Sequence, residues 1–148
     1  MSPKEDIGLQ DYRATAEFRY QIRRFLRASE QIAREYGLNP QQYQLMLAVK
    51  GLPDDHAATI GEIAERLQIQ HHSTVELADR LSAKGLVRRK RDSEDRRQVL
   101  LELTAKGEKT LRELALHHRE ELRSQGPALL EILQQLVADS RATARKHR

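Results

Sequence analysis

The chain of 148 residues contains no cysteine and no tryptophan, and only two phenylalanines. The lack of cysteine excludes disulfides, thiolate metal ligands, cysteine nucleophiles and thiol-based redox sensing, and it fits a reducing compartment. With so few large aromatic rings, a platform that stacks single-stranded bases is not expected. A globular chain of this length buries about 68–70% of its unfolded surface and needs no covalent cross-links.

Long apolar runs are also absent. The longest are a few residues, far short of the roughly 20 that a membrane-spanning helix requires. The first ten residues carry Lys4, Glu5 and Asp6 around no apolar centre, so no signal peptide is expected. Glycine-rich phosphate loops, nucleophile elbows and HExxH motifs are missing, and nothing supports an enzyme. The default expectation is a soluble cytoplasmic protein.

Helical patterns fill most of the chain. From Leu9 to Tyr36, apolar residues recur at spacings that place them on one helix face, and no glycine or proline interrupts them. Asn39 and Gln42, with Pro40 in the first turn, form a capping box for a second helix, which Gly51 ends. The residues of this helix that we expect to face inward are Tyr43, Met46, Leu47 and Val49.

Two shorter helices are predicted next. Thr59 and Glu62 form a second capping box, ahead of a helix of about two turns. A tight connection at residues 68–70 leads into another helix, from His71 to about Lys84. Its inward residues are predicted to be Thr74, Leu77, Ala78 and Leu81.

The period then changes from helix to strand. Val99, Leu101 and Leu103 alternate with their neighbours, which is the two-residue period of a strand. A polar turn cluster at residues 91–95 separates this run from residues 86–90. The pattern predicts a two-stranded ribbon with an exposed tip, the only β signal in the sequence.

The C-terminal part is helical again. Thr104 is suited to cap a helix, and we expect Gly126 and Pro127 to break it before a last, leucine-rich helix. The faces of residues 9–36 and 104–145 are too apolar to stand alone on a small domain. They are therefore expected to bury those faces against each other or against a second copy, and an obligate homodimer is the natural solution.

The net charge of +4 has a definite location. Residues 66–97 hold nine of the 26 basic and five of the 22 acidic residues, so that 17 of each sign remain outside this window. The whole surplus therefore lies on the fourth predicted helix and the hairpin. A basic element of this kind is typical of phosphate binding, whereas a solubilising face explains an isolated run of charges equally well.

The charged window coincides with two helices joined by a short turn. In that arrangement the second helix enters the major groove of duplex DNA with its N-terminal end first. Arg80 could reach a guanine edge or a phosphate, and Glu76 could accept from cytosine or pair with Arg80 at the i, i+4 spacing. The residues of this region that we expect to contact DNA are Gln70, His71, His72, Ser73, Glu76 and Arg80.

The hairpin would act as a wing. Arg96 and Arg97 lie at its tip, where an arginine can enter a narrow minor groove. We expect Asp95 to pair with one of these arginines and orient it, with stabilisation of the turn as the alternative. Arg88 and Lys90 on the first strand complete the predicted DNA contacts.

Two motifs in this region resemble the winged helix–turn–helix of the MarR family of bacterial transcriptional regulators. One is Asp95-Arg96-Arg97 leading into a strand and Leu103-Thr104, and the other is Asp79-Arg80-Leu81 followed by Gly85-Leu86-Val87. The resemblance implies a single MarR-like domain over residues 1–148. Its winged helix–turn–helix lobe would span residues 40–103, between dimerisation helices at 9–36 and 104–145.

The resemblance also implies a homodimer that places two recognition helices in successive major grooves and two wings in the flanking minor grooves. A pseudo-palindromic operator and a repressor are the usual consequences. Many members bind a small phenolic or aromatic effector between the dimerisation helices and the lobe. The residues expected to line such a cleft here are Tyr12, Tyr20, Arg24 and Tyr43.

Other functions were weighed against this one. An architectural DNA-binding dimer without an effector is the main alternative, and a winged helix that binds only proteins is another. His117, His118 and Glu121, with His56, could suggest a metal site, but they lack a second ligand pair at i, i+4 spacing. We therefore predict neither a metal nor a cofactor.

Overall fold

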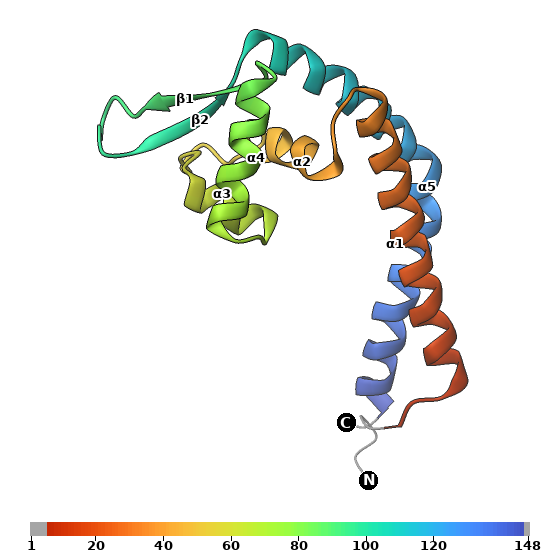
Figure 1. Ribbon diagram of the computed structural model, residues 1–148. Helices are drawn as coiled ribbons and strands as arrows, with labels where there is room; N and C mark the ends of the chain where they lie inside the picture. Colours follow the sequence, from red (N-terminus) through yellow and green to blue (C-terminus); the bar gives the residue numbers. More distant parts are fainter. Residues whose placement is uncertain (1–5, 147–148) are drawn as a thin grey trace. The chain divides into compact units, whose positions relative to one another are not determined.

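The structure, a computed structural model, describes the backbone of residues 6–146 and the side chains of residues 6–138. The predicted class, mainly helical with one small β-hairpin, is confirmed (Figure 1). None of the helices in this described range is long and apolar enough to cross a membrane. The elements are α1 (Leu9–Glu35), α2 (Pro40–Lys50), α3 (Ile60–Leu67), α4 (His71–Ala83), β1 (Val87–Arg91), β2 (Val99–Leu103) and α5 (Ala105–Lys146).

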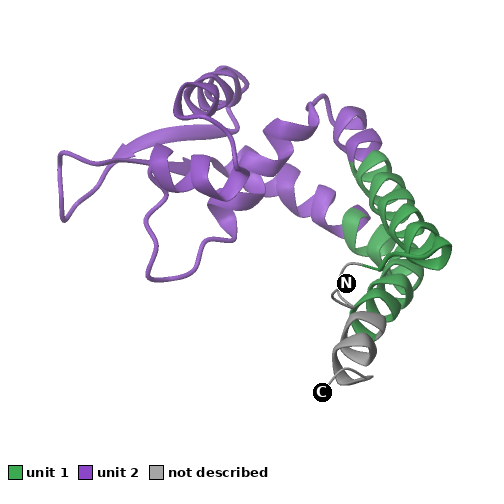
Figure 2. Ribbon diagram, turned by 90° about the horizontal axis from the view of Figure 1, so that it is seen from below, with its two compact units in different colours: residues 1–29, 118–148 green, residues 30–117 purple. Residues whose placement is uncertain are grey.

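The described chain divides into two compact units (Figure 2). Residues 30–117 form the first, which we call the lobe unit because it contains the whole predicted lobe of residues 40–103. The second consists of the residues up to Ser29 and those from His118 onward, and we call it the helix-pair unit. Helices α1 and α5 each contribute one part to either unit.

In the helix-pair unit, α1 and α5 run antiparallel and side by side (Figures 1 and 2). The ring nitrogen Nε2 of His118 lies 3.3 Å from the carbonyl oxygen of Ser29. Among the described side chains of this unit, only Ala14 and Ile132 are buried. A single chain therefore leaves most of the apolar surface of these two helices uncovered.

The predicted break at Gly126 and Pro127 is wrong, because α5 continues through both residues to Lys146. A proline inside a helix removes one backbone hydrogen bond and costs about 3 kcal/mol. The apolar residues that follow offset this cost by keeping the helical period, and Ile132 packs into the helix pair with 8% of its surface exposed.

The core of the lobe unit joins α2, α3, α4 and the base of the hairpin to the start of α5. All four residues predicted to face inward from α4, Thr74, Leu77, Ala78 and Leu81, are buried. In α2 the prediction is wrong for Leu47, which is 44% exposed, while Leu45 and Gln42 are buried. Residues 45–49 are all apolar, so the sequence pattern does not indicate which of them face the core.

The two predicted capping boxes differ in the structure. At α2 the box is complete, since Asn39 and Gln42 each accept a hydrogen bond from the other's backbone. At α3, Thr59 accepts from the backbone N–H of Glu62 at 3.1 Å, but its own N–H donates to the carbonyl of Ala57. The carboxylate of Glu62 is therefore free for other partners.

The hairpin is antiparallel, with Val87 opposite Leu103 and Arg91 opposite Val99. Its second strand has another neighbour, because Thr59 forms an isolated bridge with Leu100. Next to this bridge, the N–H of Leu101 donates to the carbonyl of Ala58 at 2.8 Å. The segment before α3 thus acts as a short third strand at the base of the hairpin.

Helix α5 begins in close contact with the turn before β1. The hydroxyl of Thr104 donates to the carbonyl of Gly85 at 2.6 Å and accepts from the N–H of Gly107 at 3.0 Å. A Cβ added at Gly107 would lie 2.0 Å from the carbonyl oxygen of Leu86. Only glycine lets the helix approach the backbone this closely.

We expect Gly107→Ala to destabilise the chain by about 1–3 kcal/mol, because the added methyl group must push the helix away from Leu86. Gly61→Ala is the matched control, since nothing lies within 4 Å of a Cβ at Gly61 in α3. That change should stabilise the chain by roughly 0.5–1 kcal/mol. Urea titrations of both variants measure this, and an unaltered midpoint for Gly107→Ala would contradict the close contact.

Candidate nucleic-acid interface

The N-terminal end of α4 is open to solvent. Gln68 adopts the left-handed conformation (φ 54°) that turns the chain from α3 into α4. Gln70 is the N-cap, and its side chain makes no capping hydrogen bond. His71 and His72 are exposed and Ser73 is half-buried. The first-turn N–H groups and the positive end of the helix dipole are thus available to an anion such as a phosphate.

Two of the predicted DNA contacts, the acid Glu76 and the base Arg80, lie on the outer face of α4. Glu76 and Arg80 are both exposed. No ion pair joins them in the part of the chain that the structure describes, so the alternative pairing at i, i+4 is not formed. Arg80 remains free to reach a ligand from the last turns of the helix.

Two acids lie against three of the four bases on the first strand of the hairpin. Arg88 and Lys90 both face Glu102 on β2, with Lys90 Nζ 4.0 Å from Glu102 Oε2. Arg89 points to the other side of the strand, where Nη1 lies 2.8 Å from Oδ1 of Asp79 on α4. Arg88 and Lys90, both predicted DNA contacts, are therefore engaged within the chain.

At the tip of the hairpin, Asp95 does not pair with an arginine side chain as expected. Its carboxylate accepts the backbone N–H of Arg97 at 3.0 Å, while its carbonyl accepts the N–H of Gln98. The carboxylate of an aspartate readily accepts a hydrogen bond from the backbone N–H two residues later and so closes a turn. Here this local hydrogen bond forms in place of an ion pair with an arginine side chain. Asp95 thus shapes the turn, which corresponds to the alternative that the sequence left open.

These contacts divide the nine basic residues of the window at 66–97. Lys84 donates to the carbonyl of Gly37 at 2.6 Å, and Arg91 donates to the carbonyl of Arg96 at 2.9 Å. Arg66, Arg88, Arg89 and Lys90 face carboxylates. Within residues 6–138, the side chains of the remaining three have no ion-pair or hydrogen-bond partner: Arg80, Arg96 and Arg97.

The four predicted effector contacts are divided between the two units, with Tyr43 in the lobe unit and Tyr12, Tyr20 and Arg24 in the helix-pair unit. Tyr43 lies in the core of the lobe unit, where burial raises its pKa. Tyr12 and Tyr20 are 64% and 50% exposed on α1, and the guanidinium of Arg24 lies over the ring of Tyr20. A separate open pocket of about 250 Å³ in the helix-pair unit is lined by Glu17, Gln21, Ala128, Glu131, Ile132 and Gln135.

The histidines considered for a metal have other surroundings. His117 lies beside the ring of Tyr36, with centroids 6.0 Å apart, and His118 is close to Ser29. Within the described residues, no group of three or more His, Asp or Glu side chains is arranged to hold a metal ion.

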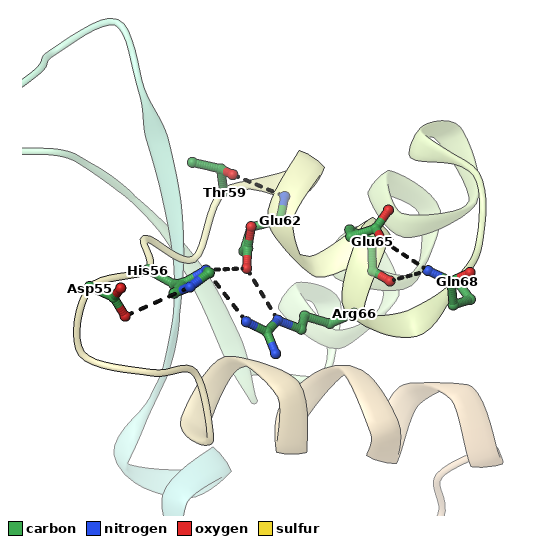
Figure 3. A network of polar contacts seen from close by, with 7 residues as sticks. All are labelled: Asp55, His56, Thr59, Glu62, Glu65, Arg66 and Gln68. Carbon is green, nitrogen blue, oxygen red and sulfur yellow. Dashed lines mark hydrogen bonds and ion pairs between the residues drawn. The ribbon is translucent and has the colours of Figure 1, made fainter.

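Sequence reasoning missed one polar network, which surrounds the start of α3 (Figure 3). Glu62 Oε1 lies 2.6 Å from Nδ1 of His56 and 3.2 Å from Nε of Arg66. The contact with the carboxylate is a hydrogen bond in the tautomer that carries the proton on Nδ1, and Nη2 of Arg66 lies 3.4 Å from the same ring nitrogen. The other ring nitrogen lies 3.7 Å from Asp55. The network ties the segment before α3 to the helix itself, and only the i, i+4 spacing of Glu62 and Arg66 hinted at it.

Hydrogen bonds from His56 and then Arg66 hold the pKa of Glu62 below its ordinary value of 4.5. The charged carboxylate therefore stabilises the fold above that value, and the stabilisation is lost as the pH falls through the lowered pKa. We expect Glu62→Gln to lower the Tm at pH 7, and its difference from wild type to shrink below about pH 4.5.

Glu65→Gln is the matched control, because the carboxylate of Glu65 faces only the side chain of Gln68 among the described contacts. Thermal melts of the wild type and both variants between pH 3 and 7 make the comparison. A Glu62→Gln variant that melts with the wild type at every pH would show that the network adds nothing to stability.

A model of the MarR family matches residues 36–98. The chain is 31% identical over 93 residues to YsmB of Bacillus subtilis, an uncharacterized HTH-type transcriptional regulator. That match covers 63% of this chain and 62% of YsmB, so the chain spans less than two thirds of this relative.

Solved structures show the same fold. AbsC, a MarR family transcriptional regulator from Streptomyces coelicolor, has a TM-score of 0.74 at 22% identity, over 97% of this chain and 98% of AbsC. The transcriptional repressor CouR, bound to a 23-mer DNA duplex, has a TM-score of 0.61 at 27% identity, over 88% of this chain and 92% of CouR. The region that the family model matches contains α3, α4 and the tip of the hairpin, so this part of the chain is similar to the MarR family.

Proposed function

We propose that this chain is a homodimeric transcriptional regulator that binds double-stranded DNA at a pseudo-palindromic site, most simply as a repressor in the cytoplasm. In this proposal α4 enters the major groove and the hairpin acts as a wing in the adjacent minor groove. The observation that carries it is the set of three unpartnered arginines on these two elements, Arg80, Arg96 and Arg97.

The charge pattern supports duplex DNA as the ligand. The positive surplus of the sequence lies between residues 66 and 97, and the rest of the chain is balanced. Phosphate neutralisation by free cations supplies most of the affinity for DNA, whereas cations already paired in the protein contribute less. The open N-terminus of α4, with exposed His71 and His72, adds donors that can approach base edges or phosphates.

Exposed apolar surface supports the homodimer. In the helix-pair unit Leu122, Leu130, Leu133 and Val137 are each 42–55% exposed, and Tyr12 and Leu9 are more exposed still. Large apolar side chains exposed in this number on two neighbouring helices are typical of a protein interface. A two-fold axis relating two chains would present two recognition helices to successive half-sites.

The role of a small-molecule effector stays a prediction from the family resemblance, and the four residues named for it belong to both units. The architectural alternative shares the same DNA-binding surface. It differs in the ratio of specific to non-specific affinity, which is large for a regulator and close to one for an architectural protein.

Arg97→Ala should weaken binding to a duplex enriched from a random-sequence pool by about tenfold or more and reduce the slope of log affinity against log salt. Arg88→Ala is the control, because Arg88 is already held by Glu102. It should have the smaller effect on both quantities. Fluorescence anisotropy titrations between 50 and about 200 mM salt measure them. Equal losses for the two variants would show that the unpaired arginines do not form the contact surface.

The wild-type chain should sediment as a dimer at micromolar concentration. Leu133→Glu should shift it towards monomer, because a charge on the exposed apolar face opposes its burial. Leu47→Glu in the lobe unit is matched in exposure, at 44% against 42%, and should leave the dimer intact. A wild-type monomer, or equal effects of the two substitutions, would contradict the assignment of the interface.

A further inference from the structure

The two faces of strand β1 make different kinds of contact. Residues two apart on a strand share a face, so Val87, Arg89 and Arg91 point one way while Arg88 and Lys90 point the other. Arg88 and Lys90 meet Glu102 within the hairpin. The first face leads from the core of the lobe unit to the tip of the hairpin, and Arg89 on it contacts an element outside the hairpin.

On that first face, Val87 is buried in the core of the lobe unit. Arg89 comes next and forms its ion pair with Asp79 on α4 at 2.8 Å. Arg91 follows and donates to the carbonyl of Arg96 at 2.9 Å. The series ties the hairpin first to the core, then to the recognition helix, and finally to the turn that carries the free arginines.

The Asp79–Arg89 pair is the one ion pair within residues 6–138 that joins α4 to the hairpin. The other side of the hairpin base is held by backbone bonds, where Leu101 donates to Ala58. On the strand, Arg89 lies two residues after Val87, the last buried residue, and about five residues before the tip of the hairpin. It is therefore placed to fix the angle of the hairpin relative to α4.

We propose that Asp79 and Arg89 are positioning residues that set the spacing between the major-groove and minor-groove contacts of the DNA-binding lobe. This inference rests on the proposed function. Both side chains are about half exposed, at 56% and 44%, so the pair adds little to stability. Its role is geometric, since it keeps the unpaired arginines of the wing at the distance from α4 that one duplex site requires.

Asp79→Asn separates this role from a simple charge effect. The substitution removes a negative charge near DNA and releases Arg89, so a pure charge effect tightens binding to every duplex. Positioning predicts a different result. Affinity for the enriched duplex should fall about fivefold or more, while affinity for a scrambled duplex is unchanged or higher. The ratio of specific to non-specific affinity then falls.

Hydroxyl-radical cleavage of the enriched duplex shows which grooves the protein protects. This pattern would not change if the pair only stabilised the fold. In complexes of the Asp79→Asn variant, protection at the outer minor grooves should weaken, while protection around the major-groove half-sites remains. Exchanging the two residues, Asp79→Arg with Arg89→Asp, keeps the net charge and reverses the pair. It should restore both the affinity ratio and the outer protection towards wild type.

Glu102→Gln is the matched control, because it breaks ion pairs on the opposite face of the hairpin and leaves Asp79–Arg89 intact. It should raise affinity for both duplexes and preserve their ratio. Circular dichroism melts confirm that all variants fold. If Asp79→Asn keeps the wild-type ratio and footprint, the inference is overturned while the proposed function stands. A wild-type chain that enriches no sequence overturns the proposed function and the inference together.

Discussion

The arrangement of acids around the hairpin determines what the basic window can bind. Strands β1 and β2 and the turn between them crowd arginines and a lysine together, and such a cluster repels itself unless carboxylates lie close to it. Glu102 and Asp79 take three of these cations. Asp95, the acid nearest the tip, is used by the backbone and neutralises none. Arginines without a carboxylate partner thereby remain on α4, at Arg80, and at the end of the wing, at Arg96 and Arg97, where the acids of the same turn balance part of their charge.

The two units differ in how much of their apolar surface they bury. The lobe unit buries a continuous core that extends from Ala33 to Leu114 and needs no second chain to cover it. The helix-pair unit buries only Ala14 and Ile132 among its described side chains, and its leucines face outward. One part of the chain thus has a buried core of its own, whereas the other leaves most of its described apolar side chains exposed.

Sequence patterns predicted most of the fold because most of it is specified locally. The caps at Asn39 and Thr59 and the buried face of α4 depend on spacing along the chain. The continuation of α5 through Pro127 and the exposure of Leu47 depend on tertiary packing, which spacing does not contain. In the candidate site, the basic residues were identified by composition and resemblance. Which of them remain free was not predicted, because Asp79 and Glu102 lie on other elements than the bases that they pair with.

Selection of duplexes from a random-sequence pool by the wild-type chain tests the central claim most directly. The account predicts one enriched site with two inverted half-sites about 10 base pairs apart. It also predicts A·T-rich, narrow minor grooves at the outer flanks, where the wing arginines enter. Enrichment that declines steeply with salt but yields no common sequence would contradict it, because the free arginines would then bind the phosphate backbone without reading a site.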